Sequence, residues 1–143
     1  MKDLKGLIRL NRWQLDEKRR ALAELQTLAD RLNGEIERLD AEIEREKASV
    51  AAAADPVAGF AVWLNAARGR RERLVQSVSQ VEAQIAAARD QIAEAFQELK
   101  KYELAQEDRD RRALLRHRRR ETAAFDEIAL NGFRRRQAAE AGE

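Results

Sequence analysis

The sequence predicts an all-α protein: an antiparallel two-helix coiled-coil hairpin whose second helix overhangs the first at its C-terminal end. The composition is the first reason, since the 143-residue chain is 38% charged and has one proline, which is typical of long helices. The second reason is that apolar residues recur at heptad spacing on both sides of that proline. We expect one coiled-coil domain over 1–143, with helix one at about 2–53, a tip at about 54–56, helix two at about 56–131 and a frayed tail at 132–143.

Helix one is predicted from a first seam that runs from Leu4 to Val50. Alternating steps of four and three residues give fourteen positions, of which eleven are apolar. The exceptions are Asn11, Lys18 and Glu46. This spacing keeps one narrow stripe facing a partner helix. The apolar positions of the first seam are Leu4, Ile8, Leu15, Leu22, Leu25, Ala29, Leu32, Ile36, Leu39, Ile43 and Val50.

The tip is predicted at Asp55 and Pro56, because Asp can cap a new helix and Pro fits its first turn. A second seam of fourteen positions follows, and Arg71 is its one polar member. A parallel dimer of one continuous helix is the alternative, but that helix would run through Pro56 and Gly59 at a cost of several kcal/mol. The apolar positions of the second seam are Val57, Phe60, Leu64, Ala67, Leu74, Val78, Val81, Ile85, Ala88, Ile92, Ala95, Leu99 and Tyr102.

The two seams match in length, which fixes the expected pairing. In an antiparallel hairpin, the numbers of facing seam residues sum to about 106 or 107, so Leu4 lies opposite Tyr102. Asn11 and Lys18 then face small alanines and can extend their polar ends toward solvent. Such polar positions can fix the register.

The segment after Tyr102 is predicted to be helix without a partner in its own chain. Between Arg109 and Arg120 it carries seven arginines and one acid, a local charge of +6, whereas the whole chain carries +2. Leu114 and Leu115 lie inside this run, so we expect it to contact a protein surface. An amphipathic patch follows, and its spacing places Phe125, Ile128, Ala129 and Gly132 on one helical face.

Few residues suit catalysis or ligand binding. The chain has no Cys and one histidine, His117, which disfavours disulfides, metal sites and nucleophilic triads. No glycine-rich phosphate loop is present. We therefore expect no catalytic residue, no metal, no cofactor and no enzyme activity. No apolar run suits a membrane span or a signal segment, which favours a cytoplasmic protein.

Two segments carry a resemblance to a family: Leu15-Asp16-Glu17-Lys18-Arg19-Arg20, and Phe125-Asp126-Glu127-Ile128-Ala129 near the C-terminus. With the size of the hairpin and the long charged second helix, they make the chain similar to the FliJ family, the small coiled-coil stalk proteins of the bacterial flagellar type III export apparatus. The resemblance implies that the helix ends bind and activate the export ATPase hexamer at the cytoplasmic face of the inner membrane. It also implies contact with the export gate membrane protein and with export chaperones.

The expected contacts divide between the two partners. For the gate, the resemblance points to Trp63 and Ala67, although Arg70 and Leu74 depart from the family pattern. For the ATPase ring, the arginine run and the C-terminal motif give Arg109, Arg112, Arg116, Arg119, Arg120, Phe125, Asp126, Glu127 and Ile128.

Three other functions stay open at this point. One is a generic coiled-coil scaffold. Another is the equivalent stalk of an injectisome, which shares the physics of the flagellar stalk. A basic helix that binds nucleic acid is disfavoured, because the overall charge is nearly balanced and no aromatic side chain interleaves the arginines. We also expect no insertion into the membrane, since the apolar face near the arginines is narrow.

Overall fold

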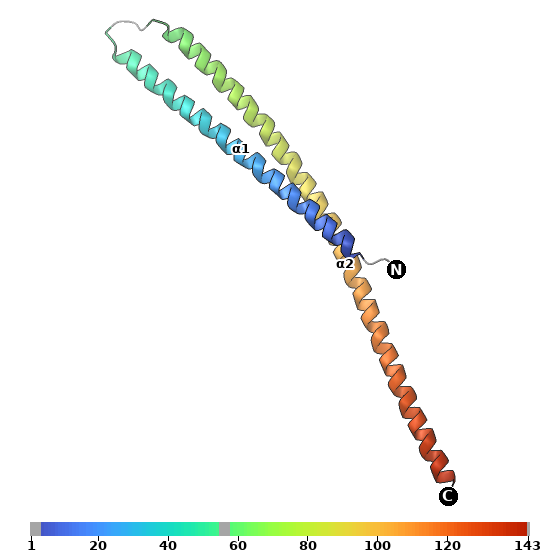
Figure 1. The fold of residues 1–143 in the computed structure, drawn as a ribbon. Coiled ribbons are helices and arrows are strands. Elements are labelled where there is room, and N and C mark those ends of the chain that lie inside the picture. The colour runs from blue at the N-terminus through green and yellow to red at the C-terminus, as the bar shows by residue number, and fades with distance from the viewer. Residues whose placement is uncertain (1–3, 55–57, 143) are drawn as a thin grey trace. The chain divides into compact units, whose positions relative to one another are not determined.

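The computed structural model describes residues 4–54 and 58–142, and nearly all of them lie in two long helices. Helix α1 spans Lys5–Ala52 and helix α2 spans Phe60–Ala141 (Figure 1). The described ranges contain no strand. The all-α prediction is therefore confirmed.

The chain divides into two compact units that share both helices. Unit one contains Met1–Leu10 and Glu98–Glu143, and unit two contains Asn11–Gln97. In unit two, α1 and α2 lie side by side and run in opposite directions (Figure 1). This unit is the helical hairpin that the matched seams predict.

The core consists of seam residues. Each of the nine buried apolar residues in the described ranges belongs to one of the two predicted seams. Burial therefore follows the heptad spacing, since only this stripe stays on the facing side of both helices. The nine residues are Ile8, Leu15, Ala29, Leu39, Ile43, Ala67, Val78, Val81 and Leu99.

One cluster in unit two tests the predicted register. Leu39, Ile43 and Ala67 form a buried group, with Leu64 packed against it. The expected pairing places Leu39 opposite Ala67 and Ile43 opposite Leu64. The four side chains meet, so the contacts agree with the register expected from the sequence.

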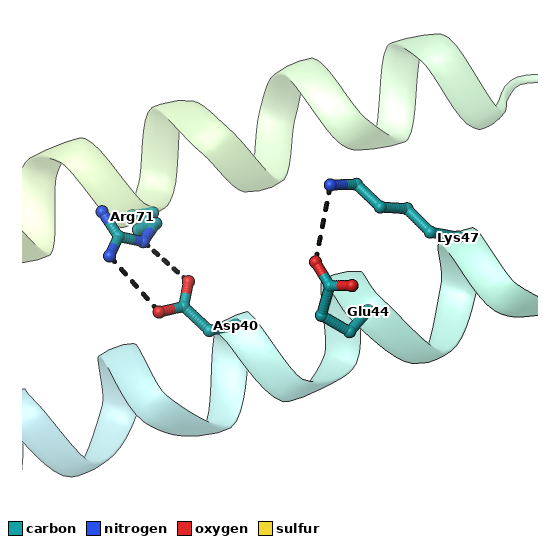
Figure 2. Close-up of polar contacts among 4 residues, drawn as sticks. All are labelled: Asp40, Glu44, Lys47 and Arg71. Atoms are coloured by element: carbon teal, nitrogen blue, oxygen red, sulfur yellow. Dashed lines mark hydrogen bonds and ion pairs between the residues drawn. The ribbon is translucent and has the colours of Figure 1, made fainter.

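Arg71, the polar member of the second seam, does not enter the core. Its guanidinium donates to both carboxylate oxygens of Asp40 on α1, at 2.6 and 3.3 Å (Figure 2). This two-point contact fixes orientation as well as distance. The hydrogen bond to Asp40 and the attraction of its charge raise the pKa of Arg71. Nearby, Lys47 and Glu44 form a 3.5 Å pair within α1 (Figure 2), which does not link the helices.

Helix α2 begins later than expected. Asp55 and Pro56, the expected cap and first turn, lie outside the described residues. Gly59 has a φ of 84°, a left-handed conformation that an α-helix cannot contain and that glycine adopts readily. Its carbonyl accepts a 2.9 Å hydrogen bond from the amide of Trp63. The helix therefore starts at Phe60 and not at 56.

Helix α2 also continues past the expected end. The expected end near 131, with a frayed tail at 132–143, is wrong, because the helix reaches Ala141. Glycine in a helix costs only about 1 kcal/mol relative to alanine. Arginine and alanine residues follow Gly132, and their high helix propensity offsets that cost.

In unit one, the start of α1 packs against α2. The amide of Leu4 donates a 3.0 Å hydrogen bond to the side-chain oxygen of Gln106, and Ile8 and Leu99 are buried. Farther along α2, every residue from Asp110 to Gly142 is exposed except Gly132. This stretch is the overhang that the sequence predicts.

Candidate partner-binding surfaces

Two open depressions in unit two, of about 380 and 400 Å³, are lined mostly by charged and polar side chains such as Glu35 and Arg89. Within the described ranges, no group of three His, Asp or Glu side chains could hold a metal ion. Candidate sites must therefore be sought on the exposed faces of the helices.

No helix in the described parts of the chain combines the length and the apolar character needed to cross a bilayer.

One exposed surface is a basic face on α2 in unit one. With about 100° between successive residues of a helix, the five arginines expected at the ATPase ring fall within an arc of about 100°. Arg112 pairs with Asp108 at 3.1 Å, while Arg116, Arg119 and Arg120 are exposed. The structure thus brings the predicted arginines onto one side. The basic face consists of Arg109, Arg112, Arg116, Arg119 and Arg120.

The opposite side of the same helix carries an apolar face. Phe125 is 70% exposed and Ile128 is 67% exposed, which is unusual for large apolar side chains on one face. Helical geometry places all members of this face within an arc of about 140°. The apolar face consists of Leu104, Leu114, Leu115, Phe125, Ile128, Ala129 and Phe133.

The sequence prediction captured only part of the apolar face. It joined Phe125, Ile128 and Ala129 with Gly132, but it left Leu104 and Phe133 out. Spacing gives the missing signal: Leu104 and Leu115, like Leu114 and Phe125, are eleven residues apart, which is close to three whole helical turns.

The acidic pair of the C-terminal motif does not share a surface with its apolar neighbours. Phe125 and Ile128 belong to the apolar face, whereas Glu127 points to the side of the basic face. Asp126 lies between the two faces. The four consecutive residues therefore present two kinds of chemistry to different sides of the helix.

The single histidine lies within the arginine run. His117 is 3.2 Å from Glu121, one turn later, and both side chains are more than half exposed. His117 is therefore an exposed helical residue.

The residues expected at the export gate lie in unit two, at the start of α2. The rings of Phe60 and Trp63 stack with centroids 6.1 Å apart, and Trp63 packs against the buried cluster. Ala67 is only 7% exposed and belongs to that cluster. Of the two residues, Trp63 therefore keeps accessible surface, whereas Ala67 lies in the core.

Comparison with known proteins gives one family. A family model described as "Flagellar FliJ protein" matches residues 1–138, which includes both helices and every candidate residue named above. Neither the curated proteins nor the solved structures contain a match to the chain.

Proposed function

The chain belongs to the flagellar FliJ family, a family of the flagellar export machinery, and we propose that it is a non-enzymatic stalk that binds and activates the export ATPase ring. In this role it is cytoplasmic and works at the cytoplasmic face of the inner membrane. It links the ring to the export gate membrane protein and meets export chaperones.

The observation that carries the proposal is the exposed part of α2 in unit one. Each residue from Asp110 to Gly142 except Gly132 is exposed, and the segment has both a basic face and an apolar face. Helices in proteins gain most of their stability by packing an apolar face against another element. A helix with two faces of different chemistry suits a ring, whose subunits surround it and contact different sides.

The basic face supplies the electrostatic part of the contact. Arginines bind carboxylates through two parallel hydrogen bonds, and cations also favour the carbonyl ends of helices. Acidic side chains and helix C-termini that line a ring would therefore hold Arg116, Arg119 and Arg120.

To activate the ring, the stalk needs no catalytic residues of its own. Binding raises the activity of a ring only if the stalk holds the active arrangement of the subunits more tightly than the inactive one. The asymmetry of α2, basic on one side and apolar on the other, gives successive subunits different contacts and hence different states.

For the gate contact, the proposal places Trp63 at the surface and gives Ala67 a supporting role. Tryptophan side chains that keep part of their surface accessible often anchor protein interfaces. Ala67 lies in the cluster against which Trp63 packs, so a larger residue at Ala67 would displace the ring of Trp63. Its effect on gate binding would be indirect.

The test is the ATP hydrolysis rate and oligomeric state of the purified export ATPase from the same organism, with and without this protein. We expect stimulation together with ring formation. The triple variant Arg116→Glu, Arg119→Glu and Arg120→Glu should lose both effects while its helix content stays unchanged.

A matched control carries the same change of charge elsewhere. The variant Arg68→Glu, Arg73→Glu and Arg89→Glu alters three exposed arginines of unit two and should keep the stimulation. Equal stimulation by both variants would remove the basic face from the mechanism. No stimulation by the unaltered protein would favour a scaffold that does not act on the ATPase.

A further inference from the structure

The apolar face of α2 in unit one is too large to be explained as scattered surface residues. Its large side chains include Leu104, Phe125, Ile128 and Phe133, which are 63%, 70%, 67% and 54% exposed. Leu114 and Leu115 are close to half exposed. Although Arg118 and Glu121 lie among them, exposed large apolar side chains gathered on one side of a helix mark an interaction surface.

The middle of this face carries apolar residues at matching distances in both directions. The centre of symmetry lies between Glu121 and Thr122. Leu114 and Ala129 are equally far from it, and so are Leu115 and Ile128. Two copies of the segment placed antiparallel would thus set the two leucines against Ile128 and Ala129, apolar against apolar.

The charges at the two ends of the segment are complementary in the same arrangement. Glu107 and Asp108 precede the centre, and Arg135 and Arg136 follow it at equal distance. Antiparallel pairing sets each acidic pair against an arginine pair. Opposite charges in these flanking positions select the orientation of paired helices.

The polar residues within the apolar face also find suitable partners. In this pairing Arg118 faces Phe125 of the second copy, and a guanidinium over an aromatic ring is a favourable contact. Arg111 faces Gly132, which has no side chain to obstruct it.

We propose that α2 of this protein pairs antiparallel with α2 of a second copy through the apolar face, about a two-fold axis close to Thr122. Such an interface uses the same patch of both copies, as two-fold symmetry requires. The acidic side chains already form ion pairs within their own helix, Glu107 with Arg111 (3.7 Å) and Asp108 with Arg112 (3.1 Å). These pairs join exposed side chains and contribute little free energy, so pairs with the arginines of a second copy can replace them.

A second copy explains the pattern better than the other surfaces that a basic amphipathic helix could bind. A nucleic acid would use the arginines and leave the apolar face uncovered. A membrane interface would bury the apolar face, but Arg118 and Glu121 lie among its residues, where burial in lipid would be costly.

The test uses the natural absence of cysteine. The variant Thr122→Cys places one thiol beside the proposed axis, so mild oxidation of the purified protein should yield a disulfide-linked dimer. The control Ala123→Cys introduces a thiol one residue later, about 100° around the helix from Thr122 and on the side of the basic face. Its dimer should be several-fold less abundant under the same conditions.

A third variant tests the orientation. Leu114→Cys should form little dimer alone, because antiparallel pairing sets the two Leu114 positions far apart, whereas parallel pairing would bring them together. Mixed with Ala129→Cys, it should form a mixed disulfide. Circular dichroism checks that each variant keeps its helix content.

Reversal of the end charges gives an independent readout. Sedimentation of the unaltered protein should show a mass that rises with concentration toward two chains. Glu107→Arg with Asp108→Arg should abolish this rise, and adding Arg135→Glu with Arg136→Glu should restore it. A single-chain mass at all concentrations, equal cross-linking at Thr122 and Ala123, or efficient Leu114 homodimers would each overturn the proposal.

These experiments use the purified chain alone, so they do not depend on the proposed role at the ATPase ring. Loss of ATPase stimulation in the arginine variant and loss of self-association in the charge-reversed variant are separate results. Either proposal can fail while the other stands.

Discussion

The substitution Leu39→Ala measures how much the seam contributes to stability. Leu39 is 7% exposed and lies in a cluster with Ile43 and Ala67. Truncation to alanine removes three buried carbon atoms, and at about 0.8 kcal/mol for each buried CH₂ group the lost transfer free energy is about 2.4 kcal/mol. A cavity normally adds to this cost. Here Trp63 and Leu74 are only partly buried and can move into the space, so we expect a total of about 2–3 kcal/mol.

The assay is urea unfolding followed by far-ultraviolet circular dichroism, with the free energy of unfolding extrapolated to water. The control Val75→Ala shortens a side chain that is 41% exposed in the same unit and should cost less than about 0.5 kcal/mol. If Leu39→Ala costs no more than the control, then Leu39 does not lie in a packed core. The register inferred from the seams would then be wrong.

The remaining predictions concern the inter-helix ion pair and two glycines. Asp40→Asn and Arg71→Gln should each lower the urea midpoint slightly, and the coupling free energy from the double variant should shrink as salt is added. The effect is small and screened by salt because both side chains are near half exposed. A coupling free energy of zero at low salt would refute the contact. Gly59→Ala should destabilise unit two by about 1 kcal/mol, since φ is positive there, and an unchanged midpoint would show that Gly59 adopts another conformation. Gly132→Ala, in helical backbone with no atom close to the added carbon, should stabilise its helix by about 1 kcal/mol, seen as slower amide exchange around that position.

Most of the fold follows from the sequence because both helices bury one narrow stripe. The heptad spacing located every buried apolar residue of the described ranges, including Ile8 near the start of α1 and Leu99 in α2. Equal seam lengths then fixed the pairing, which the contacts of Leu39 with Ala67 support. Periodicity is informative here because a hairpin of two helices has only one way to cover both stripes.

The ends of α2 were less predictable, since they depend on local conformation and not on periodicity. Proline and aspartate signals favoured a start at 56, but the positive φ of Gly59 delays it to Phe60. Gly132 indicated an end, yet the residues after it sustain the helix to Ala141. The preference of one residue for ending a helix competes with the preference of its neighbours for continuing it. The free-energy difference between the two outcomes is about 1 kcal/mol, which is too small to predict from residue types alone.

The candidate surfaces show a similar division. The five arginines of the basic face lie on one side of α2 because helical geometry alone determines it. The burial of Ala67 depends on α1, since it lies against Leu39 and Ile43. The resemblance marks Ala67 as a contact residue, but it carries no information about which side of α2 is covered by α1.

The opposite placement of the two faces of α2 has a consequence for how its contacts combine. Pairing with a second copy through the apolar face would cover Phe125 and Ile128 and leave Arg116 and Arg120 on the outside, because about 180° separates the two sides of the helix. A ring that needs only the arginines could therefore bind the paired form. A ring that also needs Phe125 could bind only the separated chain, and the free energy of self-association would then subtract from the affinity for the ring. Whether the ring needs the apolar face thus decides whether self-association competes with ATPase binding, and the apolar face together with the charges at its two ends sets the strength of that competition.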